Sequence, residues 1–206
     1  MTKHSKEIVG GLTAAVAAVA GAQVASAADA AMPDISTDWS GPYIGVSLGV
    51  EGGQTPVGLD GNYQLAAGPN FGAFIGVNHE MSNALVIGAE LAIQSGVGGD
   101  STHLASEAYN VNFIADSKVK LGMAVSPQTL IYGFGGISAG TLTQYGPHTY
   151  DFVAANFGVG AEYKVSQQFS LGVEVLARAP ISAYHWDDIA NPGLDYQGSL
   201  RAAFHF

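Results

Sequence analysis

Three histidines in polar segments of the chain carry the ring nitrogens that could bind a metal ion or the iron of a haem. They are His103, His148 and His185. His185 is followed within three residues by Asp187 and Asp188, and a histidine beside carboxylates could also take part in acid–base catalysis. The three histidines belong to separate segments, and the acidic residues around them are typical of a hydrated surface. We therefore predict no catalytic, metal-binding or cofactor-binding residue in this chain.

A second set of ionisable residues has a pattern that favours pairing in the interior of the protein. Its members are Glu90, Asp116, Lys118, Lys120, Glu162, Glu174, Arg178 and Arg201. Each lies opposite the aliphatic side chains of an alternating segment, and alternation places successive side chains on the two faces of a strand. A buried charge that loses its partner costs about 3–5 kcal/mol. We expect Glu90 to pair with Lys118. We expect Glu174 to pair with Arg201 or Arg178.

Eight segments with a two-residue periodicity can position these charges. They are residues 42–50, 70–78, 85–94, 109–124, 130–140, 152–164, 169–178 and 196–206. In the first segment Ile44, Val46 and Leu48 alternate with small or polar residues, and the others repeat this pattern except the fifth, whose glycines leave its faces unassigned. The five Lys and Arg residues after residue 27, which include Lys164, all lie opposite the aliphatic face. This pattern is typical of β-strands with lipid on one side.

The connections between these strands are short and long in alternation. Short turns are expected at residues 80–83, 125–128 and 165–168, and long loops at 51–68, 95–107, 141–151 and 179–195. A bacterial transmembrane barrel has this layout, with short periplasmic turns and long external loops. A soluble eight-stranded barrel is the alternative, and it would place the polar residues outside and the aliphatic residues inside.

The placement of the cations favours the membrane barrel. An aliphatic face in lipid requires the charged face to point inward, because a Lys or Arg side chain at the bilayer midplane costs about 2–4 kcal/mol. The interior of an eight-stranded barrel is only wide enough for side chains to fill it. The sequence therefore predicts an all-β, eight-stranded, antiparallel, up-and-down transmembrane β-barrel whose lumen is plugged by salt-bridged side chains.

The N-terminal residues have the pattern of an export signal. Lys3 and Lys6 precede an apolar segment over residues 8–22, and Ala25-Ser26-Ala27 forms a box of small residues typical of a cleavage site. We predict a signal peptide over residues 1–27, a short periplasmic segment over 28–38 and a barrel domain over 39–206. The alternative, a membrane anchor helix, fits less well because the segment is short and rich in Ala and Gly. The adjacent pair His4-Ser5 belongs to this peptide and is no catalytic candidate.

The chain is acidic and lacks cysteine, with 7 Lys and Arg against 17 Asp and Glu and a formal net charge of −10. Such a protein offers no basic patch for phosphates, so we expect no nucleic-acid partner. A barrel closed by its own strands needs no disulfide.

Aromatic residues near the strand ends are expected to anchor the barrel at the lipid headgroups. They are Trp39, Tyr43, Tyr163, Phe169, Tyr196, Phe204 and Phe206. Phe206 also ends the alternating run that begins at Leu200, and a terminal strand of this kind resembles the insertion signal of Gram-negative outer-membrane barrels. We therefore expect Phe206 to be an assembly signal for the barrel assembly machinery.

Four motifs follow one another in the chain in the order that one family of membrane barrels shows. They are Trp39-Ser40-Gly41-Pro42-Tyr43-Ile44-Gly45, Lys118-Val119-Lys120-Leu121-Gly122, Leu130-Ile131-Tyr132-Gly133-Phe134-Gly135-Gly136 and Gly158-Val159-Gly160-Ala161-Glu162-Tyr163. Together they resemble the small alphaproteobacterial outer-membrane proteins, a "porin family" branch of the OmpA-like and OmpX-like eight-stranded barrels. The second motif has Lys in place of both family arginines, which keeps the charge and loses the bidentate fork.

The resemblance implies an outer-membrane location and no specific activity, since the family includes abundant envelope proteins, surface antigens and haem binders. We expect a monomeric, structural or surface-interactive barrel without a cofactor, in contact with outer-membrane lipid and lipopolysaccharide. The first alternative is a surface protein that binds haem or a host molecule at its acidic loops. The second is an outer-membrane enzyme that modifies lipids.

Overall fold

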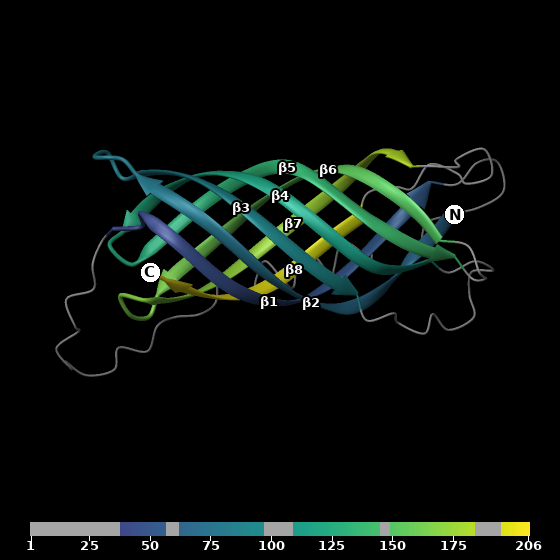
Figure 1. Ribbon diagram of the computed structural model, residues 1–206, viewed down its shortest axis with the longest axis horizontal. Coiled ribbons are helices and arrows are strands. Elements are labelled where there is room, and N and C mark those ends of the chain that lie inside the picture. Colours follow the sequence, from purple (N-terminus) through teal and green to yellow (C-terminus); the bar gives the residue numbers. More distant parts are fainter. Residues whose placement is uncertain (1–37, 57–61, 97–108, 145–148, 184–194) are drawn as a thin grey trace, which may run out of the picture. The chain divides into compact units, whose positions relative to one another are not determined.

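The computed structural model describes residues 38–56, 62–96, 109–144, 149–183 and 195–206. These residues form eight strands: β1 (Gly41–Pro56), β2 (Asn62–Glu80), β3 (Leu85–Gly96), β4 (Tyr109–Ser126), β5 (Thr129–Gln144), β6 (Thr149–Lys164), β7 (Phe169–Ala183) and β8 (Asp195–His205). Each strand pairs antiparallel with the next, and β8 pairs with β1, which closes the barrel (Figure 1). The predicted eight-stranded, up-and-down β-barrel is confirmed. Among the described residues, no helix has the length and apolar character needed to cross a membrane.

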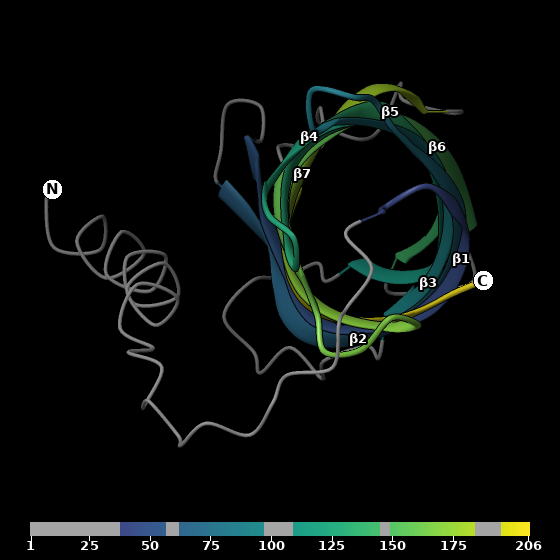
Figure 2. The ribbon, with the colours of Figure 1, turned by 90° about the vertical axis from the view of Figure 1, so that its left-hand side faces the viewer.

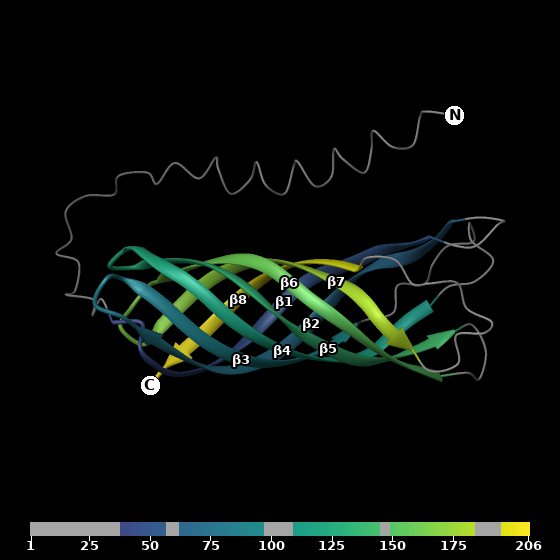
Figure 3. The ribbon, with the colours of Figure 1, turned by 90° about the horizontal axis from the view of Figure 1, so that it is seen from above.

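The three short turns lie at the same end of the barrel as the end of β8, and we call this the turn end (Figure 1 and Figure 3). The opposite end is the loop end. At the turn end the predicted strand limits agree with the structure to within two residues. At the loop end the predicted start of β4 at residue 109 agrees with the structure, but the predicted limits of β1 and β2 were wrong, because β1 continues to Pro56 and β2 begins at Asn62. Backbone pairing continues beyond the apolar band, whereas alternating hydrophobicity marks only the part of a strand that faces lipid.

The outer surface of the barrel is apolar and the inner surface is mostly polar. Leu200 on the outside is 64% exposed, whereas its neighbour Arg201 points inward and is 5% exposed. The structure also assigns the faces of β5, where Ile131 points outward and Tyr132 points inward. Apolar side chains exposed around the whole outer surface are suited to lipid rather than water. A closed barrel can span the lipid because its strands leave no backbone hydrogen-bonding group unpaired at an edge.

Gly41 begins β1 with a φ of +123°, a conformation that residues with a side chain rarely adopt. Replacing Gly41 with Ala should lower the free energy of unfolding by about 1–3 kcal/mol, because a residue held in such a region is strained. Urea denaturation in lipid vesicles measures this loss. Gly133→Ala is the matched control, since a Cβ there would meet only the carbonyl oxygen of Gly158 at 3.8 Å. Equal losses for the two variants would contradict the assignment.

Candidate functional site

Six buried ionisable side chains meet in the lumen, and we call them the central cluster. They are Glu90 on β3, Lys118 and Lys120 on β4, Glu162 on β6, Glu174 on β7 and Arg201 on β8. None of them is more than 5% exposed. The inward positions of five different strands supply these side chains. Three carboxylates therefore face three cations in a site that is largely closed to water.

Glu90 is the most heavily contacted carboxylate of the central cluster. Arg201 binds it with both terminal nitrogens, Nη2 to Oε2 at 2.6 Å and Nη1 to Oε1 at 3.0 Å. The Tyr43 hydroxyl donates to Oε2 at 2.8 Å. The Nζ atoms of Lys118 and Lys120 each lie 3.4 Å from a Glu90 oxygen. Charge-assisted and bidentate hydrogen bonds of this kind are the strongest in proteins.

Glu174 holds the other side of the central cluster. It accepts hydrogen bonds from Lys118 Nζ at 2.5 Å, Arg201 Nη1 at 2.8 Å and the Tyr132 hydroxyl at 3.1 Å. Lys118 and Arg201 thus each contact both Glu174 and Glu90. Since β3 and β7 are not neighbours in the barrel, these contacts cross the lumen.

Glu162 is the third carboxylate, and it links the central cluster to a buried serine and histidine. Its oxygens lie 3.5 Å from Lys120 Nζ and 3.3 Å from the Ser170 hydroxyl. Ser170 Oγ is in turn 2.9 Å from His205 Nε2. Ser170 lies on β7 and His205 on β8, so the two residues are far apart in the sequence and their contact was not predicted. Glu162 contacts the serine, whereas in a catalytic triad the acid orients the imidazole. Ser170 and His205 are also both buried. The arrangement therefore differs from that of a catalytic triad.

A second group lies nearer the loop end, and we call it the loop-end cluster. It consists of Arg178, Asp116, Asp195 and Glu51. Arg178 binds Asp116 through Nη2 at 2.8 Å and Nε at 3.2 Å, and its Nη1 lies 2.8 Å from Asp195 Oδ2 and 3.8 Å from Glu51 Oε1. Of the two partners expected for Glu174, the structure shows Arg201, whereas Arg178 pairs with Asp116.

The sequence analysis missed Glu51 and Asp195 because it assigned both to loops. Each lies in a strand, Glu51 in β1 and Asp195 at the start of β8. Extending the alternation of Ile44 to Val50 by one residue would have placed Glu51 on the inward face. Extending the alternation of β8 toward its start would have done the same for Asp195. Both positions follow from strand periodicity once the strands are allowed to run past the apolar band.

Aromatic rings line the lumen around the cations. These rings were not predicted from the sequence. Lys118 Nζ lies 4.7 Å from the Phe134 ring centroid, Lys120 Nζ 4.4 Å from that of Tyr132, and Arg201 Cζ 3.8 Å from that of Phe74. A cation over an aromatic face is stabilised by the ring quadrupole. Several inward glycines make room for these rings, since a Cβ at Gly45 or Gly160 would overlap Phe74 or Tyr132.

Two of the aromatic residues expected at the headgroups lie inside the barrel. Trp39 is 0% exposed and Tyr43 is buried, so the girdle assignment was wrong for both. Tyr43 alternates with the outward Ile44, and this alternation could have identified it as inward-facing. Five others of the set have at least part of their surface exposed: Tyr163, Phe169, Tyr196, Phe204 and Phe206.

The remaining sequence candidates are placed as follows. Phe206 is 75% exposed, its backbone N–H donates to the Pro42 carbonyl at 3.1 Å, and its ring lies 5.1 Å from that of Phe204. The candidate residues His103, His148, His185, Asp187 and Asp188 lie outside the described residues, as does the predicted signal peptide. Within the described ranges, no three His, Cys, Asp or Glu side chains converge as a metal site would require.

Comparison with known families adds to this geometry. The family model of the outer membrane protein beta-barrel domain matches residues 12–198 of the chain. The chain belongs to this family. It is accordingly an outer-membrane β-barrel protein, and its apolar exterior faces the lipid of the cell's outer membrane.

The chain is also similar to individual outer-membrane proteins. It is 28% identical over 178 residues to the 31 kDa outer-membrane immunogenic protein of Brucella melitensis, and this match covers 72% of the chain and 74% of the relative. The same protein of Brucella suis matches equally well. Among solved structures, the fold is similar to Neisserial surface protein A, with a TM-score of 0.55, 9% identity and coverage of 81% of this chain and 98% of the other. Ail of Yersinia pestis has a TM-score of 0.50 at 11% identity, covering 81% and 99%.

Proposed function

We propose that this outer-membrane β-barrel protein has a structural and surface role, and that its lumen is closed to solutes and performs no catalysis. The observation that carries this proposal is the central cluster, whose ion pairs reach across the lumen from Glu90 to Glu174. Eight strands enclose a space that side chains fill, whereas water-filled porin channels need about sixteen. The rings beside the cations occupy further volume at the same depth.

A role at the cell surface is supported by the distribution of charge. All five Lys and Arg residues of positions 38–206 are buried inside the barrel, so the surface of the described residues presents carboxylates and no Lys or Arg. Asp151 near the loop end is one exposed example. Such a surface repels polyanions and suits a basic partner or lipopolysaccharide phosphates bridged by divalent cations. The Brucella relative is named as immunogenic, which agrees with display at the surface.

The closed lumen is tested by planar bilayer recording on pure, refolded protein. We expect no stable steps of porin size at neutral pH, because the side chains of the central and loop-end clusters fill the barrel interior. A sixteen-stranded porin recorded under the same conditions serves as the positive control. Stable porin-sized steps from this protein would refute the closed lumen.

A further inference from the structure

Residues 38–40, which lead into β1, turn into the barrel at the turn end. Figure 2, which looks at this end, shows the short coloured trace that leads into β1 lying within the ring of strands. The positive φ of Gly41 permits this reversal. As a result Trp39 is the largest fully buried side chain among the described residues, and it belongs to a buried apolar cluster with Leu130 and Tyr132.

Two reciprocal hydrogen bonds attach this segment to the end of β2. The backbone N–H of Trp39 donates to Glu80 Oε2 at 2.7 Å, and the backbone N–H of Glu80 donates to Ser40 Oγ at 2.9 Å. The Ser40 N–H donates to Asp38 Oδ1 at 2.7 Å, and hydrogen bonding from the backbone and hydroxyl of Ser40 holds the pKa of the Asp38 carboxyl below its usual value. The backbone of Trp39, the side chain of Asp38 and both the backbone and side chain of Ser40 are therefore held by hydrogen bonds.

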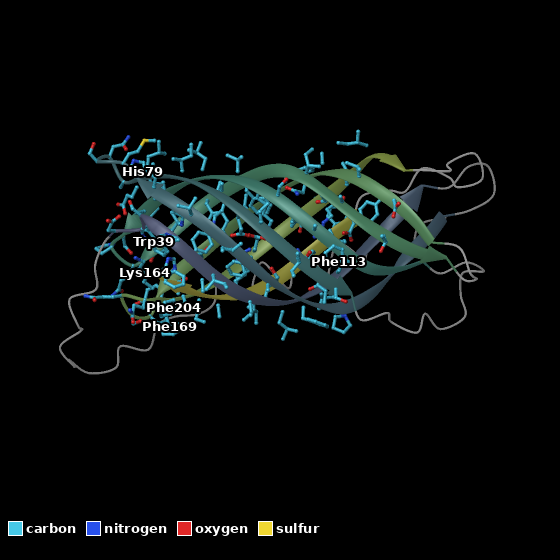
Figure 4. All side chains as sticks on the ribbon, in the orientation of Figure 1. Trp39, His79, Phe113, Lys164, Phe169 and Phe204 are labelled. Carbon is cyan, nitrogen blue, oxygen red and sulfur yellow. The ribbon has the colours of Figure 1, made fainter. Side chains whose placement is uncertain are left out.

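The ends of β6 and β8 hold the segment from other sides of the barrel. Lys164 Nζ donates to the Asp38 carbonyl at 2.5 Å and lies 4.8 Å from the centroid of the Trp39 ring (Figure 4). The His205 ring packs edge-on against Trp39 with 5.8 Å between centroids. Residues of three strands thus hold Trp39: Lys164 of β6 and His205 of β8 contact its indole, and Glu80 of β2 binds its backbone N–H. A chance surface contact would involve one neighbouring strand rather than three.

We propose that Asp38-Trp39-Ser40 is a lid that closes the periplasmic mouth of the lumen, with Trp39 as its stopper. The lid keeps periplasmic water away from the central cluster, and ion pairs are stronger where water is excluded. This inference rests on the closed lumen proposed above and adds the element that closes it on the periplasmic side.

Tryptophan fluorescence tests the lid directly, because the chain has only two tryptophans, Trp39 and Trp186. The Trp186→Phe variant leaves Trp39 as the sole emitter in protein refolded into vesicles, with heat-modifiable migration as the check of folding. We expect acrylamide to quench Trp39 several-fold less than in the urea-unfolded chain. We also expect brominated lipids to quench it weakly. Strong quenching by acrylamide would show an open mouth, and strong quenching by brominated lipids would place Trp39 in the headgroup girdle; either result overturns the lid.

A second variant tests what holds the lid. In the Trp186→Phe background, Glu80→Ala should raise acrylamide quenching of Trp39 several-fold, because it removes the carboxylate that accepts the backbone N–H of Trp39. Glu80→Gln keeps an acceptor oxygen and should have a smaller effect, and it serves if the Ala variant does not fold. His79→Ala is the matched control, since this neighbouring side chain is exposed. Equal quenching in the Glu80 and His79 variants would overturn the proposal. Porin-sized conductance would overturn both the closed lumen and the lid, whereas strong acrylamide quenching of Trp39 in a barrel that does not conduct would overturn the lid alone.

Discussion

Replacing Glu90 with Ala is expected to destabilise the barrel by about 3–5 kcal/mol, the cost of leaving a buried charge without its partner. Glu90 accepts hydrogen bonds from Arg201 and Tyr43 and lies beside Lys118 and Lys120. Its removal changes a cluster of three carboxylates and three cations into one with an unbalanced positive charge. Urea denaturation of protein refolded into lipid vesicles gives the free energy of unfolding for comparison with the unchanged chain.

The matched control for this variant is Asp151→Ala. Asp151 is also acidic and lies in a strand, but its side chain is exposed. A surface substitution away from buried contacts changes stability by about 0.5 kcal/mol or less. If the Glu90 and Asp151 variants unfolded at the same urea concentration with the same slope, the central cluster would not stabilise the barrel.

Removing Phe206 is expected to leave most of the protein unassembled in the periplasm, degraded or aggregated. Its N–H bonds to the Pro42 carbonyl and continues the pairing that joins β8 to β1. Its ring extends a row of outward aromatics through Phe204 to Phe169, with 5.1 Å between successive centroids. The pairing of β8 with β1 removes the last open edges of the sheet, which lipid does not tolerate. Heat-modifiable protein in outer-membrane fractions measures the assembled amount.

Leu200→Ala controls for a general loss of apolar surface on the same face of β8. Leu200 is as outward-facing as Phe206 and lies in the middle of the strand. We expect this variant to assemble at the level of the unchanged protein. Normal assembly of the chain without Phe206 would show that this residue is no assembly signal.

Strand periodicity was enough to predict the number of strands, their antiparallel order and the face that each strand except β5 presents to lipid. The alternation of Ile44, Val46 and Leu48 corresponds to outward positions in β1. This succeeds because successive side chains in a strand must point to opposite faces, and lipid on one face selects aliphatic residues there. The rule loses its signal where a strand extends beyond the lipid, so the loop-end limits of β1 and β2 could not be predicted.

The sequence predicted two pairs on neighbouring strands, Glu90 with Lys118 and Glu174 with Arg201, and both are present. Only the tertiary structure determined which side chains meet across the lumen. Contacts between Glu90 and Arg201, and between Lys118 and Glu174, join strands that are distant in the sequence. Such contacts depend on the stagger and tilt of the closed barrel, which set the depth of each inward residue relative to the opposite wall. Trp39 lies outside β1, so strand alternation says nothing about it. Its position follows from the reversal of the chain at Gly41 and from partners on three separate strands.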